Sequence, residues 1–518
     1  MFADAPSAIA TPDIVWSALA PQLILMIGGV IMLTIVSVIK RRPIKGVYAL
    51  YTIVIASAAL LSTIPLWHRV LNPAEGPSAL VGGAVGFDGF SLLAIGIICI
   101  GVILCALLAD GYLQREGIDG PELYVLMLLS ASGGGVMASA NDLIVLFIGL
   151  EILSISAYIM TSMHARRLSS QEAGMKYFVL GAFASAFLLY GIAMIYGATG
   201  STNLGDIQQF LAENILLKNG LLILGLALMT VGFGFKVAAV PFHQWAPDVY
   251  QGAPTPVTAF MASVVKVAGF AGFIRVFTVA FSTYILQWRP AIFALAVLSL
   301  VVGSVGAVVQ TNVKRMLAYS SINHAGFILL GLQAGTVGTS ASLFYLGAYT
   351  FMVIGSFGVA SLVGRVGDGR QSLDDYQGLS RSRPALALAM AILLLAQAGT
   401  PLTAGFFAKF GVIKAAAETH NWSLAVIAML SAVISAFLYL RIVVSMYFGG
   451  TAQEPATLQG PPVRVPASAR IAIIVALLGT LAMGIVPEPF SKLAREATAQ
   501  ITAQPADELA PFGPLAGP

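Results

Sequence analysis

The sequence predicts an all-α polytopic membrane protein with about fourteen transmembrane helices. The chain has 518 residues, of which 58% are hydrophobic and only 10% are charged, and its mean hydropathy is +0.89. In soluble domains roughly a quarter of all residues are charged, so this composition excludes a soluble protein. Apolar runs long enough to cross a bilayer also recur along almost the whole chain. We therefore expect one integral membrane domain over residues 1–518.

Each apolar run predicts one helix in chain order. The runs cover residues 16–39, 47–66, 88–109, 122–139, 142–163, 174–198, 220–239, 254–281, 290–309, 315–333, 339–364, 384–417, 422–447 and 467–488. The first run is expected to be a retained helix, because no basic segment or cleavage site precedes it. We group them as three N-terminal helices (16–109), two sets of five (122–281 and 290–447) and a last helix (467–488).

The distribution of cations predicts how the chain is oriented. Of the 27 Lys and Arg residues, seven lie within apolar runs and fifteen lie in the loops on one side. The other five are Arg69, Lys218, Arg289, Lys492 and Arg495, on the side of the two termini. Cations collect in cytoplasmic loops, so both termini are predicted on the periplasmic side of a bacterial inner membrane. The net charge of +4 marks no nucleic-acid surface, since no basic cluster has interleaved aromatics.

Two of the predicted helices, the seventh and the twelfth, are expected to be broken. Four prolines follow Lys236 within twenty residues: Pro241, Pro247, Pro254 and Pro256. The run 384–417 would be about 51 Å long as one helix, against a hydrocarbon core of about 30 Å. We expect its break at Gly399–Pro401, because proline removes a backbone donor. Two breaks five helices apart predict two five-helix repeats of inverted topology, an architecture used by transporters.

Five ionisable residues within the runs are the candidate functional residues: Glu151, Lys236, Lys266, His324 and Lys409. Charges at membrane depth are costly and are functional by default. Lysine can change its protonation state when buried and arginine cannot, so lysines suit a proton relay. We expect Glu151 to be protonated, hydrated or paired with Lys236 or Lys266. The alternatives are structural ion pairs for the carboxylate and lysines, and a hydrogen bond between helices for His324.

The remaining intramembrane cations and the cysteines receive structural interpretations. Lys176 follows Glu172 by four residues and Lys414 precedes Glu418 by four, which predicts interfacial pairs. Arg441 lies close to the inside face, and roles for His243 and Arg275 are left open. Cys99 and Cys105 fit no metal pattern, and no nucleotide-, flavin- or haem-binding motif occurs. We expect no metal and no cofactor in this chain.

Four segments resemble a known family. They are GFGFKVAAVPFHQWAPDVYQGAPTPVTAFMASVVK, NDLIVLFIGLEILSISAYIM, KRMLAYSSINHAGF and GTPLTAGFFAKF. They resemble the antiporter-like membrane subunits of proton-pumping NADH–quinone oxidoreductase, respiratory complex I, and the PDVYQGAPTPV wording favours the N type over the L and M types. The resemblance covers residues 16–488. It implies that Glu151, Lys236, Lys266, His324 and Lys409 match the family's proton-relay residues.

The resemblance also implies partners. FMN, iron–sulfur clusters and quinone would belong to partner subunits, and the chain would sit in a hetero-oligomer beside subunits M, K and J and membrane lipids. Three alternatives stay open at this point. They are a subunit of a multisubunit cation/proton antiporter, the equivalent subunit of a photosynthetic-type complex, and a scaffold whose charges only hold helices together.

Overall fold

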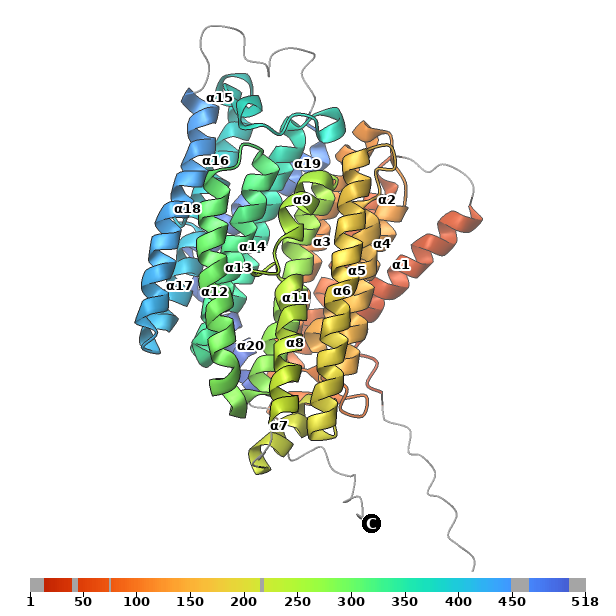
Figure 1. Ribbon diagram of the computed structural model, residues 1–518. Coiled ribbons are helices and arrows are strands. Elements are labelled where there is room, and N and C mark those ends of the chain that lie inside the picture. Colours follow the sequence, from red (N-terminus) through yellow and green to blue (C-terminus); the bar gives the residue numbers. More distant parts are fainter. Residues whose placement is uncertain (1–13, 40–44, 74–75, 215–218, 449–464, 503–518) are drawn as a thin grey trace, which may run out of the picture.

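The computed structural model describes residues 14–39, 45–73, 76–214, 219–448 and 465–502. Long helices run side by side and form one bundle (Figure 1). The short helix α15 (Leu379–Ser382) lies at one end of this bundle, and α7 (Leu204–Glu213) and α20 (Glu488–Thr502) lie at the other (Figure 1). We call these the α15 end and the α20 end.

The N-terminal part contains three long helices and a small hairpin. The helices are α1 (Ala20–Val38), α2 (Val47–Leu71) and α3 (Gly89–Glu116). Strands β1 (Ser78–Leu80) and β2 (Val85–Phe87) pair antiparallel between α2 and α3. Gly82 and Gly83 turn the hairpin with φ of +64° and +85°, a conformation that favours glycine. The hairpin departs from the predicted all-α fold, because its strands are too short to produce an apolar run.

The next segment contains the first broken helix. It comprises α4 (Glu122–Ser139), α5 (Leu143–Thr161), α6 (Leu168–Thr199), α7, α8 (Gly220–Lys236), α9 (Trp245–Gly252), α10 (Thr255–Phe260), a π-helical turn (Met261–Val265) and α11 (Lys266–Val279). The last three are continuous, so Thr255–Val279 is one helix with a π turn inside it.

The second broken helix lies in the C-terminal part. This part comprises a 3₁₀ turn (Ser282–Tyr284), α12 (Ile285–Val308), α13 (Val313–Gln333), α14 (Gly335–Val363), 3₁₀ turns at Val366–Asp368 and Leu373–Tyr376, α15, α16 (Pro384–Ala398), α17 (Ala404–Glu418), α18 (Trp422–Phe448), α19 (Ala467–Ile485) and α20.

Every predicted run overlaps a helix of the structure. Among the described residues, eleven helices are long and apolar enough to cross a membrane, and α8 and α16 are shorter apolar helices. The two predicted breaks are confirmed, between α8 and α9 and between α16 and α17. The count of fourteen crossings and the boundaries of the two five-helix sets stay predictions. The amphipathic helices α7 and α20 carry too few apolar residues to be detected as runs.

The centre of the bundle is built from its most buried helices. The most apolar stretch is fully buried in Thr255–Val279, 89% buried in α14 and 78% buried in both α3 and α4, but only 28% buried in α2, and nearly all residues of α13 are buried as well. Large apolar side chains are exposed on outer helices such as α1, α2, α6 and α18, as expected for a surface in contact with lipid. Polar side chains on these central helices are therefore shielded from lipid.

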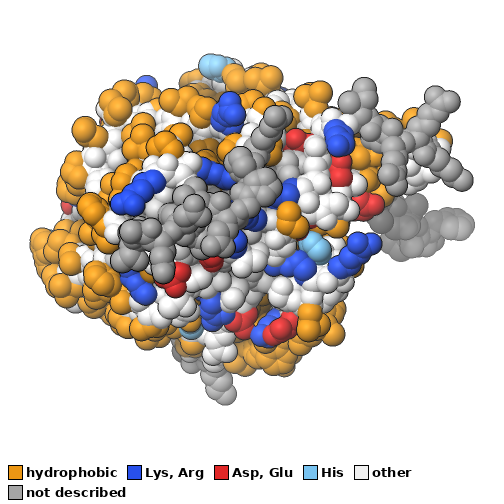
Figure 2. Space-filling view, turned by 90° about the horizontal axis from the view of Figure 1, so that it is seen from above, with side chains coloured by type: hydrophobic (Ala, Val, Ile, Leu, Met, Phe, Trp, Pro, Cys, Tyr) orange, Lys and Arg blue, Asp and Glu red, His pale blue; other side chains and the backbone are white. Residues whose placement is uncertain are grey.

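Charged side chains gather at the α15 end. Seen from that end, Lys and Arg side chains lie over the middle of the face, and hydrophobic side chains form much of its rim (Figure 2). Arg315 and Lys176 both pair there with Asp248, at 2.6 and 2.9 Å. This end carries loops that the cation distribution predicts to be cytoplasmic.

Candidate functional site

Lys236 is the last residue of α8, at the first helix break. Its side chain is buried, and its Nζ donates a hydrogen bond to Ser154 Oγ of α5 over 2.7 Å. Trp245 Nε1 donates at 3.0 Å to the Phe235 carbonyl near the end of α8, which also accepts from the Ala238 amide. The break thus leaves a lysine ammonium, held by a hydroxyl, inside the bundle.

Glu151 lies on α5 within reach of a hydroxyl, not of an ammonium. Ser185 Oγ of α6 donates to Glu151 Oε1 over 2.5 Å. Among the described residues, Glu151 has no ion pair with Lys236 or Lys266 within 4 Å, so a direct pair is not observed. Ser185, Ser154 and Lys236 line one cavity of about 10 Å³. That volume is close to what one water molecule needs, so the connection from Glu151 to Lys236 runs through hydroxyls and a water-sized space.

Lys266 is the first residue after the π turn of helix Thr255–Val279. Its buried Nζ donates to both the carbonyl and the Oγ of Ser321, each over 2.6 Å. It also lies 5.6 Å from the ring centre of Tyr349 on α14, where the electron-rich ring face attracts a cation. Single π turns inside α-helices are frequently found at functional sites.

His324 of α13 joins a chain of hydroxyl groups. Its Nδ1 is 2.5 Å from the Tyr345 hydroxyl, and its Nε2 is 3.1 Å from the Tyr439 hydroxyl. The Tyr439 hydroxyl also lies 2.5 Å from Ser320 Oγ. Ser320 is the chain neighbour of Ser321, which accepts from Lys266. Hydroxyls and imidazole can each donate and accept, so the chain of groups from Tyr345 through His324 and Tyr439 to Ser320 can pass a proton.

Lys409 lies at the second helix break. The segment from Gly399 to Thr403 separates α16 from α17, as predicted from Pro401. Lys409 is only 5% exposed, and its Nζ donates to the carbonyl of Ala398, the last residue of α16, over 3.0 Å. Its Nζ is also 5.0 Å from the ring centre of Phe327 on α13. The predictions that this helix breaks near Pro401 and that Lys409 faces the protein interior are confirmed.

The structure thus arranges the five predicted residues around hydroxyl, carbonyl and aromatic groups. We call Glu151, Lys236, Lys266, His324 and Lys409 the polar axis. Sequence reasoning missed the hydroxyl groups that contact these residues, on Ser154, Ser185, Tyr345 and Tyr439, and the Tyr349 ring beside Lys266. Two of these had a detectable signal, because tyrosines 345 and 349 are four residues apart in an apolar run and share a helix face.

Three of the other cations within the apolar runs, Arg275, Lys176 and Lys414, are paired with carboxylates. Arg275 is fully buried, and its Nη2 lies 2.7 Å from Asp88 Oδ1. Lys176 lies 2.7 Å from Glu172, and Lys414 lies 3.6 Å from Glu418, which confirms both predicted i,i+4 pairs. Arg441 donates to the backbone carbonyls of residues 308 and 310. His243 is partly exposed and has its Nδ1 3.3 Å from the Pro241 carbonyl, with no contact to the polar axis among the described residues.

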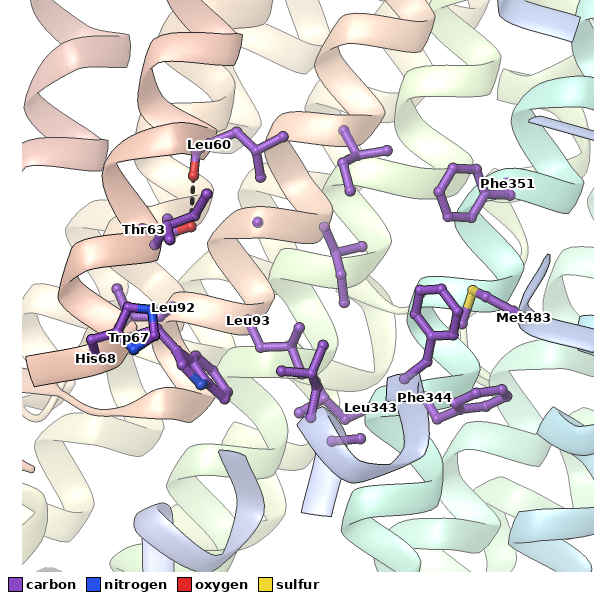
Figure 3. A pocket seen from close by; sticks show the side chains of 18 residues that line it. Leu60, Thr63, Trp67, His68, Leu92, Leu93, Leu343, Phe344, Phe351 and Met483 are labelled. Carbon is purple, nitrogen blue, oxygen red and sulfur yellow. Dashed lines mark hydrogen bonds between the residues drawn. The ribbon is translucent and has the colours of Figure 1, made fainter. Parts of the chain in front are cut away.

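An apolar cavity of about 370 Å³ is lined by residues of α2, α3, α14, α19 and α20 (Figure 3). Phe344, Gly347 and Phe351 of α14 line it together with Leu93 of α3 and Met483 of α19 (Figure 3). Tyr345 and Tyr349, on the other face of the same helix, contact His324 and Lys266. No residue of the polar axis lines this cavity, so α14 separates an apolar compartment from the polar one.

Comparisons with known proteins identify the family. Residues 140–435 match the family described as NADH:quinone oxidoreductase/Mrp antiporter, TM. The chain is 40% identical over 482 residues to NADH-quinone oxidoreductase subunit N of Trichlorobacter lovleyi, covering 93% of this chain and 96% of that protein. The chain belongs to the NADH-quinone oxidoreductase subunit N family. Another subunit N, from Mycobacterium bovis, is 45% identical over 395 residues, covering 75% of this chain and 73% of that protein.

Solved structures agree with this membership in the subunit N family. A chain of respiratory complex I from Thermus thermophilus with bound Aureothin is 33% identical with a TM-score of 0.75, covering 92% of this chain and 99% of that one. A chain of the Mrp complex from Dietzia has a TM-score of 0.81 at 20% identity, covering 95% and 98%, and shows a shared fold alone. The predicted family and fold class are confirmed. The chain is a multi-pass membrane subunit of a hetero-oligomeric NADH-quinone oxidoreductase.

Proposed function

We propose that this chain carries protons across the membrane along the polar axis, while electron transfer from NADH to quinone takes place in partner subunits. Glu151 and Lys236 form one part of the path, Lys266 and His324 the middle, and Lys409 the far end. Membership in the subunit N family supports the coupling to NADH oxidation.

One observation carries the proposal, the difference between paired and unpaired buried cations. Buried Arg275 lies against Asp88, and buried Lys314 lies 3.6 Å from Asp368. Among the described residues, no carboxylate lies within 4 Å of the ammonium groups of the three axis lysines, whose acceptors are neutral hydroxyls and carbonyls. A scaffold would pair its buried charges, because an unpaired one is expensive. Neutral acceptors instead suit groups that gain and lose a proton.

The contacts fit a proton relay in chemical detail. An ammonium donates to a hydroxyl, and after it loses its proton the neutral amine can accept from the same hydroxyl. Ser154 and Ser321 offer this exchange to Lys236 and Lys266. The Tyr439 hydroxyl, between His324 and Ser320, can donate to one neighbour while it accepts from the other. Arginine could replace none of these lysines, because it holds its proton at any accessible pH.

The proposal extends to assembly and orientation. FMN, iron–sulfur clusters and quinone belong to partner subunits, and this chain holds no redox site of its own. Its neighbours are the antiporter-like subunit M and the small subunits K and J, in the bacterial inner membrane with membrane lipids around them. Both termini lie on the periplasmic side, which the surplus of cations in the loops of the opposite side supports.

The test uses the whole complex, purified through a tag on this chain and reconstituted in vesicles. We expect flavin- and iron–sulfur-containing subunits to co-purify and NADH to drive proton uptake into the vesicles. Lys266→Leu should assemble and lose most of this uptake, whereas Lys414→Leu, which removes an exposed surface pair, should not. Sodium-dependent exchange without NADH oxidation would identify an antiporter instead. Normal pumping by Lys266→Leu would favour a scaffold.

A further inference from the structure

The helix that carries Lys266 has no N-terminal cap of its own. Helix Thr255–Val279 follows Pro254, which makes no side-chain cap. The first amides of a helix need acceptors, and a cap is usually a side chain just before the helix. Here the acceptor is Asp368, which is 113 residues away in sequence. Its Oδ2 accepts from the Thr255 amide at 3.3 Å and from the Thr255 hydroxyl at 2.9 Å.

Asp368 is held in an unusual backbone conformation. It ends the 3₁₀ turn that follows α14, and its side chain is 1% exposed. Both Arg365 and Asp368 have positive φ, at +55° and +48°, a region that non-glycine residues rarely adopt. Such conformations persist where the surroundings over-determine them, and they cluster at functional sites. The strained backbone of this turn therefore places the Asp368 carboxylate at the start of helix Thr255–Val279.

Three cations surround this carboxylate at the α15 end. Arg167 Nη1 lies 3.5 Å from Asp368 Oδ2, Lys314 Nζ lies 3.6 Å from the same atom, and Arg115 Nη2 lies 3.9 Å from Oδ1. Burial alone raises the pKa of Asp368, but Lys314 and Arg167 outweigh burial and hold the pKa below its ordinary value. Asp368 is therefore an anion at neutral pH, the form that best stabilises a helix N-terminus.

Lys314 contacts the segment just before the start of helix Thr255–Val279. Its Nζ donates to the carbonyl of Ala253, two residues before the helix starts, over 2.7 Å. The chain from Ala253 to Thr255 is thus fixed by Lys314 on its carbonyl and by Asp368 on its amide. Both contacts come from the C-terminal part of the molecule, from α13 and from the turn after α14.

The opposite end of the helix is fixed as well. Arg275 Nη2 lies 2.7 Å from Asp88 Oδ1, and its Nε donates to the Ala138 carbonyl over 2.8 Å. The π turn Met261–Val265 lies between the Asp368 cap and Lys266. A helix turns about 100° and rises about 1.5 Å per residue, so a slip of one residue at the capped end would take the Lys266 ammonium off Ser321.

We propose that Asp368 is a positioning residue for Lys266, through which the C-terminal part of the chain fixes where this lysine meets Ser321. The inference rests on the proposed function, because it gives Lys266 a role in proton transfer. Asp368 contacts the start of the helix and acts on Lys266 through eleven residues of helix.

The test is Asp368→Asn in the whole reconstituted complex, with NADH oxidation and proton uptake measured together. The amide keeps the size of the side chain and removes its charge. We expect the complex to assemble and the number of protons moved per NADH to fall, because the loss of one helix cap weakens the equilibrium that holds Lys266 at Ser321 by about fivefold. Asp368→Glu should recover part of the ratio. Asp374→Asn, on an exposed side chain of the same connection, should leave it unchanged.

Two further variants separate positioning from general stability. Thr255→Val removes the hydroxyl contact to Asp368 and keeps the amide contact, so it should lower the number of protons moved per NADH less than Asp368→Asn does. If Asp368→Asn does not assemble, Thr255→Val tests the inference in its place. Ser321→Ala removes the hydroxyl that accepts from Lys266. If Asp368 acts through this contact, the double variant should reduce proton transfer by less than the product of the two single reductions. A proportional fall in oxidation and uptake, or fully multiplicative effects, would overturn the inference. Normal pumping by Lys266→Leu would instead overturn the proposed function itself.

Discussion

Lys236 and Lys409 both lie at broken helices, but on different sides of the break. Lys236 is the last residue of α8, before the interruption, whereas Lys409 is the sixth residue of α17, after it. Lys236 donates to a side-chain hydroxyl, Ser154, and Lys409 donates to a backbone carbonyl, Ala398. The two breaks therefore offer their lysines chemically different acceptors.

This difference separates two kinds of proton carrier. A hydroxyl accepts from an ammonium and can then donate to the neutral amine, so Ser154 serves both protonation states of Lys236. A carbonyl can only accept, and the carbonyls at the end of α16 attract positive charge. Lys236 also shares a water-sized cavity with the serine that holds Glu151, while Lys409 has an aromatic ring beside it. We infer that Lys236 readily exchanges its proton with neighbouring groups, whereas the contacts of Lys409 favour its protonated form.

The largest effect is expected at Lys236. Lys236→Ala should assemble and lower NADH-driven proton uptake by about tenfold or more, because a group that takes part in proton transfer contributes at least that much. Lys236→Arg should be nearly as defective, since it keeps the charge and cannot release the proton. Uptake into vesicles, with NADH oxidation measured in parallel, checks this. Lys176→Ala is the matched control, because Lys176 forms an exposed interfacial pair. Loss of assembly would make Lys236 structural.

Glu151→Gln is expected to have the next largest effect. The amide keeps an acceptor for Ser185 Oγ, but it can neither take up a proton nor attract a cation through the cavity beside Lys236. Proton uptake should fall several-fold, and Glu151→Asp should keep part of it. Glu172→Gln, on the exposed surface of α6, serves as the control. Full activity of Glu151→Gln would show that the carboxylate takes no part in proton transfer near Lys236. The first break would then lack an acidic group, as the second break does.

At the second break, proton uptake should depend on whether the residue at position 409 can carry a proton. Lys409→Leu should lower proton uptake more than Lys409→Glu, because a protonated glutamate can still donate to the Ala398 carbonyl and leucine cannot. The same vesicle assay measures both variants. Leu402→Ala, an exposed change within the α16–α17 break, tests whether disturbance of the break alone lowers uptake. Equal activity of the leucine and glutamate variants would exclude Lys409 as a proton carrier.

The two breaks also show what the sequence could predict. A 34-residue apolar run has to break or protrude, and Pro401 located the break to within a few residues. Likewise, four prolines after Lys236 indicated the first break. Both conclusions depend on local sequence alone: on length, on the missing proline donor and on the cost of buried charge.

The partners of the polar axis could not be predicted in the same way. Ser154 is 82 residues from Lys236, and Tyr439 is 115 residues from His324. Which hydroxyl meets which lysine is decided by how helices pack across the bundle, and a single serine in an apolar helix resembles any other. Glu151 was expected to be protonated, hydrated or paired with a lysine, and the sequence could not indicate that the Ser185 hydroxyl would contact the carboxylate. The Asp368 cap was invisible because it joins two segments 113 residues apart.

The smallest effect is expected in the connection between the two breaks, at Tyr439. Its hydroxyl lies 3.1 Å from His324 Nε2 and 2.5 Å from Ser320 Oγ, so Tyr439→Phe removes both contacts and keeps the ring. His324 keeps its contact with Tyr345, and water can occupy the vacated polar space, so proton uptake should fall only about two- to threefold, as for the loss of one modest hydrogen bond. Tyr345→Phe, which removes the other contact of His324, should have a similar effect. The double variant leaves His324 without either hydroxyl and should fall further than the product of the two, because each hydroxyl compensates for the loss of the other. If both single variants and the double variant pump normally, protons reach Lys409 without His324.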